Sequence, residues 1–349
     1  MTLPLSDEPA RAGYRMPAEW EPHAGTWISW PHNRDTWPGK FEPVEPAMAA
    51  LAAALAACET LHVNVLDEGH ERHVAALLRA RGVDTGVIFH RFPTNDAWCR
   101  DHGAIFVVRP GAEPLAAVDC DYNAWGGKYP PFDLDNLIPA RMAQWLGVPR
   151  YRGAMVLEGG SIDVNGAGTL LTTEQCLLNP NRNPLLSRAD IEARLAALFA
   201  VRRVLWLGDG IEGDDTDGHV DDLTRFVGRR TVVTAVESAP DDVNFAPLRA
   251  NRERLAAMTT ADGESLEVVE LPMPSAHYQD GRRLPASYAN FYIANGAVLL
   301  PVFGDPQDRD AAAVLQHCFP DRRVIPVDCL DLVWGLGTVH CLTQQIPRT

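Results

Sequence analysis

The chain has 349 residues, enough for one large domain or two of average size, and 46% of them are hydrophobic while 22% are charged. This composition excludes a disordered, collagen-like or disulfide-scaffold chain. The 31 basic and 46 acidic residues give a net charge of −15, which repels a phosphate backbone and excludes nucleic acid as the expected partner. The same charge attracts small cations, although many soluble proteins are equally acidic.

The seven cysteines contain no CxxC pair, so the sequence indicates neither a disulfide framework nor a zinc ribbon. This usage is typical of a reducing compartment, and we expect a cytoplasmic protein. The first 17 residues hold charges and prolines in place of a continuous apolar stretch, so no signal peptide is expected. The longest apolar run, 47–58, is far shorter than the roughly 20 residues that span a bilayer, and it predicts a soluble helix without membrane association.

Strand-like runs alternate with helical patterns along the chain and predict an α/β fold. The clearest helix is 187–199, where Ser187 and Asp190 form an N-terminal capping pattern. No linker or break in composition divides the chain, so residues 1–349 are expected to form a single domain. The predicted strands are 61–66, 105–108, 170–173, 204–207, 231–236, 291–294, 298–302 and 324–327.

Three segments, 161–172, 223–234 and 289–300, share an outline of strand, glycine turn and strand. Their turn glycines are Gly166, Gly228 and Gly296, which lie 62 and 68 residues apart. Division of the chain by five gives about 70 residues per unit, so the spacing favours five repeated units that close into a propeller. Hairpins with glycine turns are also common in unrelated α/β proteins, and the spacing alone leaves both interpretations open.

Reactive side chains fall in step with this repeat. Asp101, Glu158, His219 and Cys341 are separated by 57, 61 and 122 residues, and the last step is twice 61. In a ring of five units, these residues would point from equivalent positions toward one central cleft. A cysteine, a histidine and carboxylates around one cleft permit nucleophilic catalysis, because an imidazole can move protons for an attacking thiolate.

Other residues near these positions are candidates for the pocket. Gly337 leaves room for backbone to approach a ligand, and Trp98 fits either a core or a lid. The acidic run 212–217, which contains Asp214 and Asp215, favours a bound cation or is a solvated loop. Because no HExxH motif, CxxC pair or dense histidine cluster occurs, no catalytic metal is expected. Carboxylates beside a cysteine suit a planar cation, for which a guanidinium is the obvious candidate.

The sequence resembles the agmatine deiminases and Porphyromonas-type arginine deiminases of the guanidine-modifying pentein superfamily, along its whole length. The segments that carry the resemblance are Pro-Ala-Glu-Trp-Glu-Pro-His at 17–23, Asn-Asp-Ala-Trp-Cys-Arg-Asp-His-Gly at 95–103, Glu-Gly-Gly-Ser-Ile at 158–162, Asn-Arg-Asn-Pro at 181–184, Asp-Gly-His-Val-Asp at 217–221, Ser-Tyr-Ala-Asn-Phe-Tyr at 287–292 and His-Cys-Leu-Thr-Gln-Gln at 340–345. The resemblance implies a five-bladed, pseudo-fivefold α/β propeller, no metal, no organic cofactor and a homodimer.

The resemblance also implies roles for individual residues. Cys341 would be the nucleophile, His219 the general acid and base, and Glu158 the carboxylate that orients His219. Asp101 and Asp221 would grip the guanidinium. The implied reaction forms an amidino-cysteine intermediate, releases ammonia and converts agmatine to N-carbamoylputrescine, a step toward putrescine and other polyamines. The implied substrate-binding residues are Trp98, Asp96, Asp214, Asp215 and Gly337.

Three positions depart from the agmatine deiminase pattern, in which Asn is usual at each. They are Asp217, Asp222 and Thr338, and we expect them to border the substrate. An extra carboxylate suits the distal amine of agmatine, whereas free arginine needs a cation for its carboxylate. Agmatine is therefore the favoured substrate, and free or C-terminal peptidyl arginine, giving citrulline, is the alternative. A pentein that only binds a partner, without catalysis, is a lesser alternative.

Overall fold

The computed structural model describes residues 8–349, in which helices and strands alternate as an α/β fold. The helices are α1 (Val44–Ala56), α2 (Glu68–Ala80), α3 (Cys99–His102), α4 (Ala124–Gly127), α5 (Ile138–Leu146), α6 (Glu174–Leu177), α7 (Arg188–Phe199), α8 (Phe245–Ala256) and α9 (Asp308–Cys318). Short 3-10 turns are η1 (Asp135–Leu137), η2 (Gly159–Ser161), η3 (Val220–Asp222) and η4 (Val333–Gly335).

The strands of this part of the chain form six sheets. They are β18-β1-β2-β3, β4-β5-β6, β7-β8-β9, β10-β11-β12, β15-β16-β17 and the small pair β13-β14. The strand bounds are β1 (His23–Ser29), β2 (Thr60–Asn64), β3 (Val87–His90), β4 (Ile105–Val108), β5 (Leu115–Asp121), β6 (Arg150–Val156), β7 (Asp163–Val164), β8 (Thr169–Thr173), β9 (Arg203–Leu207), β10 (Thr224–Phe226), β11 (Thr231–Val236), β12 (Glu267–Pro272), β13 (Tyr278–Gln279), β14 (Arg282–Arg283), β15 (Tyr292–Ala294), β16 (Ala297–Val302), β17 (Arg323–Asp328) and β18 (Thr343–Pro347).

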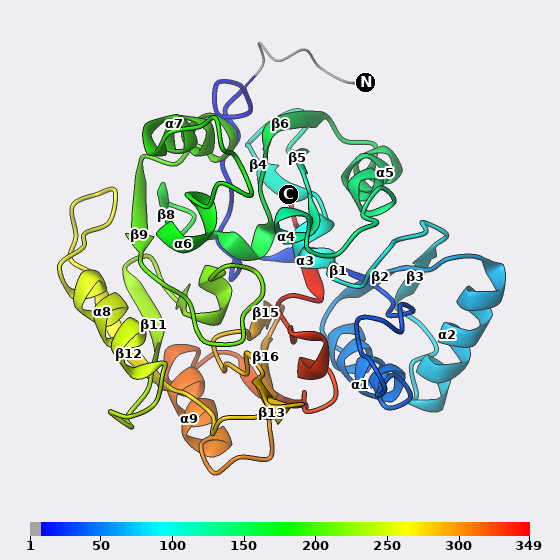
Figure 1. Ribbon diagram of the computed structural model, residues 1–349. Helices are drawn as coiled ribbons and strands as arrows, with labels where there is room; N and C mark the ends of the chain where they lie inside the picture. The colour runs from blue at the N-terminus through cyan, green and yellow to red at the C-terminus, as the bar shows by residue number, and fades with distance from the viewer. Residues whose placement is uncertain (1–7) are drawn as a thin grey trace.

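Five of these sheets repeat one arrangement. A strand pairs with one neighbour in the antiparallel sense and with the other in the parallel sense, as β8 does with β7 and β9. In the fifth sheet the antiparallel partners come from opposite ends of the chain, because β1 pairs with β18 and Ile28 lies opposite Thr343. Figure 1 shows the sheets around the middle of the molecule, with α2, α5, α7, α8 and α9 on the outside.

The predicted turns and helices are confirmed. Gly166, Gly228 and Gly296 each lie in the turn between the two antiparallel strands of a hairpin. Helix α7 begins after Ser187, whose side chain forms a capping box with Asp190. The eight strands predicted from the sequence all exist, with ends shifted by no more than a few residues. Within residues 8–349, none of the helices is both long enough and apolar enough to span a membrane.

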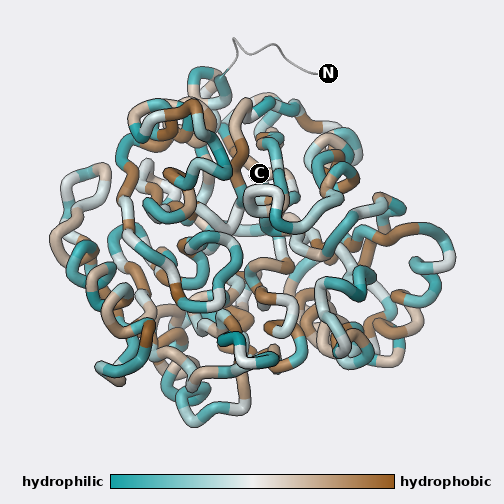
Figure 2. The backbone as a smooth tube through the Cα atoms, in the orientation of Figure 1, coloured by the Kyte–Doolittle hydropathy of each residue, from teal (hydrophilic) through white to brown (hydrophobic). Residues whose placement is uncertain are grey.

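The hydrophobic core lies between the sheets and the outer helices. One face of α7 is buried through Ile191, Leu195, Leu198 and Phe199, which pack in a cluster with residues of β4 to β9. Figure 2 shows hydrophobic and hydrophilic stretches alternating along the outer helices, as expected where one helix face is buried and the other is solvated. This packing fixes the inner ends of the sheets, where the reactive side chains lie.

Candidate active site

Reactive residues precede the first strand of successive sheets. Asp101 is in α3 before β4, Glu158 precedes η2 and β7, and His219 precedes η3 and β10. Cys341 lies two residues before β18, and Asn290 lies two residues before β15. The fourth unit of the repeat therefore contributes Asn290, which the sequence analysis did not assign.

A cavity of about 850 Å³ opens beside these residues, a size typical of small-molecule sites. Cys341 and Asp101 both line it, whereas Glu158, His219 and Asp221 are buried behind them. Of the ten residues proposed from the sequence, those that line the cavity are Asp96, Trp98, Asp101, Asp215, Gly337 and Cys341.

Asn290 organises the segment that carries Cys341. Its Oδ1 accepts hydrogen bonds from the Thr338 hydroxyl at 2.8 Å and from the His340 backbone N–H at 3.0 Å. Its Nδ2 lies 3.1 Å from Cys341 Sγ, as a donor. Thr338 thus supports the cysteine segment and is not among the lining residues, contrary to the expectation that it borders the substrate. A donor at this distance favours the thiolate form of Cys341.

The Cys341 thiol has a difficult electrostatic position. Burial raises its pKa well above the ordinary value, and the carboxylates of Asp221, Asp222 and Asp101 raise it further. Asp221 Oδ2 lies 3.9 Å from the sulfur. The free thiol is therefore protonated at neutral pH, and a positive charge beside it is needed to favour the thiolate.

His219 lies among carboxylates without a hydrogen bond. Its Nδ1 is 3.8 Å from Asp101 Oδ1 and 4.0 Å from Asp221 Oδ1, and neither ring nitrogen has a partner among residues 8–349. Burial alone would lower the pKa of His219, but Asp101, the neighbouring sulfur of Cys176 and Asp221 raise it well above its ordinary value. The imidazole is therefore protonated at neutral pH and can act as an acid.

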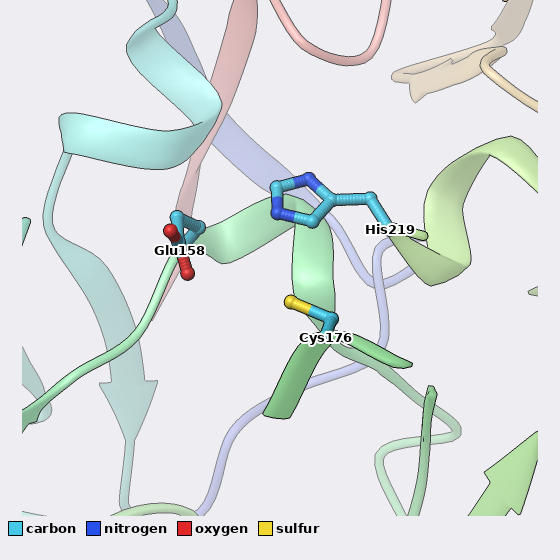
Figure 3. Close-up of side chains that lie close together, drawn as sticks. All are labelled: Glu158, Cys176 and His219. Carbon is cyan, nitrogen blue, oxygen red and sulfur yellow. The ribbon is translucent and has the colours of Figure 1, made fainter. Parts of the chain in front are cut away.

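Glu158 and Cys176 flank the imidazole (Figure 3). A carboxylate oxygen of Glu158, the sulfur of Cys176 and a ring nitrogen of His219 all lie within 4.8 Å of one another. Glu158 Oε1 accepts a hydrogen bond of 2.6 Å from Arg182 Nε, whereas its Oε2 is buried without a partner in the described chain. No hydrogen bond joins Glu158 to His219, so the expected orienting contact is absent from this arrangement.

Asp101 and Asp221 are held rigidly by neighbouring donors. Asp101 accepts from Trp125 Nε1 and from the Gly160 N–H, each at 3.0 Å. Burial raises the pKa of Asp101 to about 6, partly opposed by His219. The pKa of Asp221 is lowered, because the hydrogen bond and charge of His340 outweigh burial. Asp221 Oδ1 has no hydrogen-bond partner among the described residues.

A buried bridge supports Asp221 from behind. His340 Nδ1 lies 2.7 Å from Asp221 Oδ2, and its Nε2 lies 2.8 Å from Glu19 Oε2. Glu19 also binds Arg225 and Arg100, and their charges with that of His340 hold its pKa well below the ordinary value despite burial. The imidazole of His340 thus lies between two buried carboxylates and connects Asp221 to Glu19.

The acidic run before His219 has a different role from the one expected. Both oxygens of Asp214 accept from the loop: Oδ1 from the Thr216 N–H at 2.7 Å and Oδ2 from the His219 N–H at 3.1 Å. Asp217 pairs with Lys128 at 2.7 Å and with Arg182 at 2.6 Å. Asp217 was expected to border the substrate, but it is not among the residues that line the cavity and its carboxylate is already paired. Asp214 shapes the loop and is also absent from the lining.

The outer part of the cavity combines acidic and aromatic side chains. Asp96 accepts from the Thr36 hydroxyl at 2.8 Å, and burial raises its pKa to about 6. Asp215 is held by Tyr129 and Arg282. Trp98 is 4% exposed and packs on Trp37, with ring centroids 5.6 Å apart, so it serves both the core and the cavity wall.

Gly337 and Gly160 are required by close approach. A Cβ on Gly337 would lie 2.5 Å from the Trp98 ring. A Cβ on Gly160 would lie 2.6 Å from His219 Nδ1, 2.9 Å from Asp101 Oδ1 and 3.0 Å from Asp221 Oδ2. These distances are below ordinary contact, so neither position accepts a side chain without displacement of the groups that form the site.

We expect Gly160→Ala to lower the free energy of unfolding by about 1–3 kcal/mol, because the added methyl group overpacks a buried site. Urea unfolding measures this change. Gly228→Ala is the matched control, since the nearest atom to its Cβ would be in Thr231 at 3.5 Å, and it should change stability by less than about 0.5 kcal/mol. Equal stability of the two variants would contradict the packing described for Gly160.

The chain is similar to known proteins over nearly its whole length. Residues 15–347 match the family model for Porphyromonas-type peptidyl-arginine deiminase. The sequence is 40% identical to agmatine deiminase of Pseudomonas fluorescens, with 98% of each chain covered. The structure is similar to agmatine deiminase of Enterococcus faecalis, with a TM-score of 0.93, 35% identity and 98% of each chain covered. It is also similar to a substrate-bound agmatine deiminase of C. jejuni, with a TM-score of 0.87, 30% identity and 96% of each chain covered.

Proposed function

The chain belongs to the Porphyromonas-type peptidyl-arginine deiminase family, and we propose that it is an agmatine deiminase, a hydrolase that acts on the C–N bond of a guanidine. The similarity to agmatine deiminases at 35–40% identity over 98% of the chain supports this assignment. We also propose that the five repeated sheets are the blades of a pseudo-fivefold pentein propeller formed by residues 1–349 as one domain. The regular order of antiparallel and parallel pairing supports that fold.

The charge of the cavity is the observation that carries the choice of agmatine. Six aspartates line it: Asp35, Asp96, Asp101, Asp135, Asp215 and Asp280. Burial raises the pKa of Asp135 well above its ordinary value and Asp215 is paired with Arg282, so the other four supply the acidic groups of the lining. The two lining arginines are already paired, Arg34 with Glu42 at 2.9 Å and Arg282 with Asp215. Agmatine carries positive charge at both ends, so it fits an acidic cavity better than arginine, whose carboxylate needs a free cation.

In the first step, Cys341 attacks the guanidinium carbon. Asp101 and Asp221 grip the guanidinium, whose charge offsets the carboxylates that raise the pKa of Cys341. Substrate binding thus favours the thiolate that attacks, and the thiol proton passes to water in the cavity, because His219 is already protonated. The bond from the guanidinium carbon to one terminal nitrogen breaks, and His219 donates the proton with which ammonia leaves.

In the second step, water replaces the sulfur. His219, now neutral, takes a proton from water as the oxygen attacks the amidino carbon, and the C–S bond breaks to release Cys341. One guanidine nitrogen has been exchanged for oxygen, and the product is N-carbamoylputrescine. Glu158, held by Arg182, supplies negative charge that stabilises the imidazolium form of His219.

Arginine, free or at a peptide C-terminus, is the second candidate substrate. Arg282 favours it, because this side chain is half exposed at the cavity and would bind a substrate carboxylate if it left Asp215. Such an exchange breaks an existing ion pair, whereas agmatine leaves it intact. The acidic lining therefore places arginine second.

We expect kcat/KM for agmatine to exceed that for arginine or a C-terminal arginine peptide by roughly 100-fold, which corresponds to about 2.7 kcal/mol of unfavourable charge contact. Mass spectrometry of each reaction measures the products, with a gain of about one dalton and release of ammonia where deimination occurs. Arg282→Ala should lower turnover of arginine without a comparable loss for agmatine. Equal or faster turnover of arginine would reverse the assignment.

A further inference from the structure

Cys176 is a buried thiol that the proposed reaction does not use. It lies in α6, and its side chain lies close to both the His219 imidazole and the Glu158 carboxylate (Figure 3). Burial raises the pKa of Cys176, an effect that the neighbouring His219 opposes. The sulfur is therefore a protonated thiol in the free protein, and it interacts weakly with the imidazole of His219.

We propose that Glu158, Cys176 and His219 form a binding site for a thiophilic divalent cation of the Zn²⁺ type, and that its occupancy blocks the proposed reaction. The ligand atoms, a carboxylate oxygen, a thiol sulfur and an imidazole nitrogen, all lie within 4.8 Å of one another. This set of sulfur, nitrogen and oxygen ligands is the one that zinc prefers. Binding needs only modest contraction toward the metal, because three ligands of a tetrahedral ion lie roughly 3.5 Å apart.

Unsatisfied buried atoms point independently to a ligand at this place. Glu158 Oε2 is buried without a hydrogen bond in the described chain, and the nitrogens of His219 have only a weak interaction with the Cys176 sulfur in place of a well-formed hydrogen bond. Arg182 binds only the other oxygen, Oε1, and so leaves Oε2 free. A buried polar atom without a partner is costly, and a cation would satisfy both ligands at once.

The surrounding charge and the route from solvent suit a cation. Asp101 lines the cavity and its Oδ1 lies 3.8 Å from His219 Nδ1, so one carboxylate separates the cavity from the buried site, and entry of a metal requires local movement there. Asp221 adds a second carboxylate at 4.0 Å. On binding, Cys176 and His219 each release one proton, and no oxidation or reduction occurs.

Metal binding at this site does not depend on the proposed function, but the inhibition that we expect from it does. A metal bound to His219 removes the nitrogen that donates the proton to ammonia and later takes one from water. Zn²⁺ should therefore inhibit turnover, and a chelator should restore it. A second group, Asp221, Asp222 and Cys341, also lies within 4.8 Å and is the competing location for the metal.

The test uses the full-length Cys341→Ser variant, which lacks the competing thiol. We titrate it with Co²⁺ and follow the sulfur-to-cobalt charge-transfer absorption, with Zn²⁺ as the competing ion. One equivalent should produce the band. Addition of Cys176→Ala should abolish it and weaken Zn²⁺ binding by at least about 100-fold, because loss of a direct ligand should cost no less than the largest losses seen for the groups that support a ligand. Cys318→Ser, a change in a half-buried thiol outside both groups, is the matched control and should leave the band unchanged.

His219→Gln in the Cys341→Ser background is a second variant, and it leaves the Cys176 side chain unchanged. It should weaken binding while the protein remains folded by circular dichroism. If the wild-type protein shows the band and the Cys341→Ser variant does not, the metal binds at the competing group and the proposal is overturned. Persistence of the band without Cys176, or no binding of either metal, would overturn it as well. Because binding is measured without turnover, these outcomes are separate from failure of the agmatine deiminase assignment.

Discussion

Cys341→Ser should lower kcat for agmatine by about 10⁴-fold or more, because the chemistry depends on a covalent bond to this sulfur. A serine hydroxyl at this position keeps the donor from Asn290 but has a far higher pKa than a thiol, among carboxylates that already oppose ionisation. The bound guanidinium cannot offset that difference. Steady-state assay of ammonia release measures the loss.

Binding should survive this change. Asp101 and Asp221 remain in place, so calorimetry should give an agmatine Kd within a few-fold of the KM of the wild type. Cys318→Ser tests whether loss of any thiol has a similar effect, and it should keep full activity, since Cys318 lies at the end of α9 on the outside of the molecule. Turnover by Cys341→Ser within tenfold of the wild type would exclude Cys341 as the nucleophile.

His219→Gln should lower kcat by roughly 10³-fold, within the usual range for loss of a general acid and base. A glutamine can donate a hydrogen bond but cannot transfer a proton, so both departure of ammonia and activation of water are slowed. His73→Gln is the control, because the His73 side chain is 52% exposed and is paired with Glu45, away from the reactive residues. It should leave kcat unchanged.

The pH profile of kcat/KM separates a proton-transfer role of His219 from a structural one. The pKa of Asp101 is about 6, so its carboxylate takes up a proton and the grip on guanidinium weakens as pH falls through that value. The pKa of His219 is raised, so its acid form is lost only as pH rises well above 6.5. His219→Gln should lose the alkaline limb and keep an acidic limb that is shifted to higher pH, because the charge of His219 no longer lowers the pKa of Asp101. An unchanged alkaline limb would show that another group donates the proton.

Much of the site was predictable because its residues recur with the repeat. Each of these residues lies shortly before the first strand of a sheet, so their spacing matches that of the sheets along the chain. They are Asp101, Glu158, His219 and Cys341. The same rule could have found Asn290, which occupies the unit between His219 and Cys341. Its residue type gave no signal, because an asparagine side chain is neither an acid, a base nor a nucleophile, although the double step of 122 residues leaves room for one more unit.

Contacts between distant segments were not predictable from local pattern. The bridge from Glu19 to His340 spans 321 positions, and nothing near either residue indicates it. The carboxylate of Asp217 was expected to face substrate, but neutralisation by Lys128 and Arg182 depends on loops that meet only in the folded chain. Cys176 was passed over for the same reason, since only α6 brings it to His219.

The fold was easier to predict where local signals agree. Strands rich in β-branched residues and turns with glycine located the hairpins, and the Ser187 cap located α7. The pairing of β1 with β18 joins the two ends of the chain and has no local signal. It is nevertheless important for the site, because it fixes β18 immediately after Cys341.

The most direct test of the proposed chemistry is rapid quenching of the wild-type enzyme with agmatine in acid, followed by mass spectrometry of the intact protein and its peptides. We expect a transient adduct with the mass of agmatine less ammonia, located on Cys341, which forms before N-carbamoylputrescine and decays as it appears. Adduct formation on another residue, or a complete single turnover with no adduct on Cys341 at any time point, would contradict the mechanism.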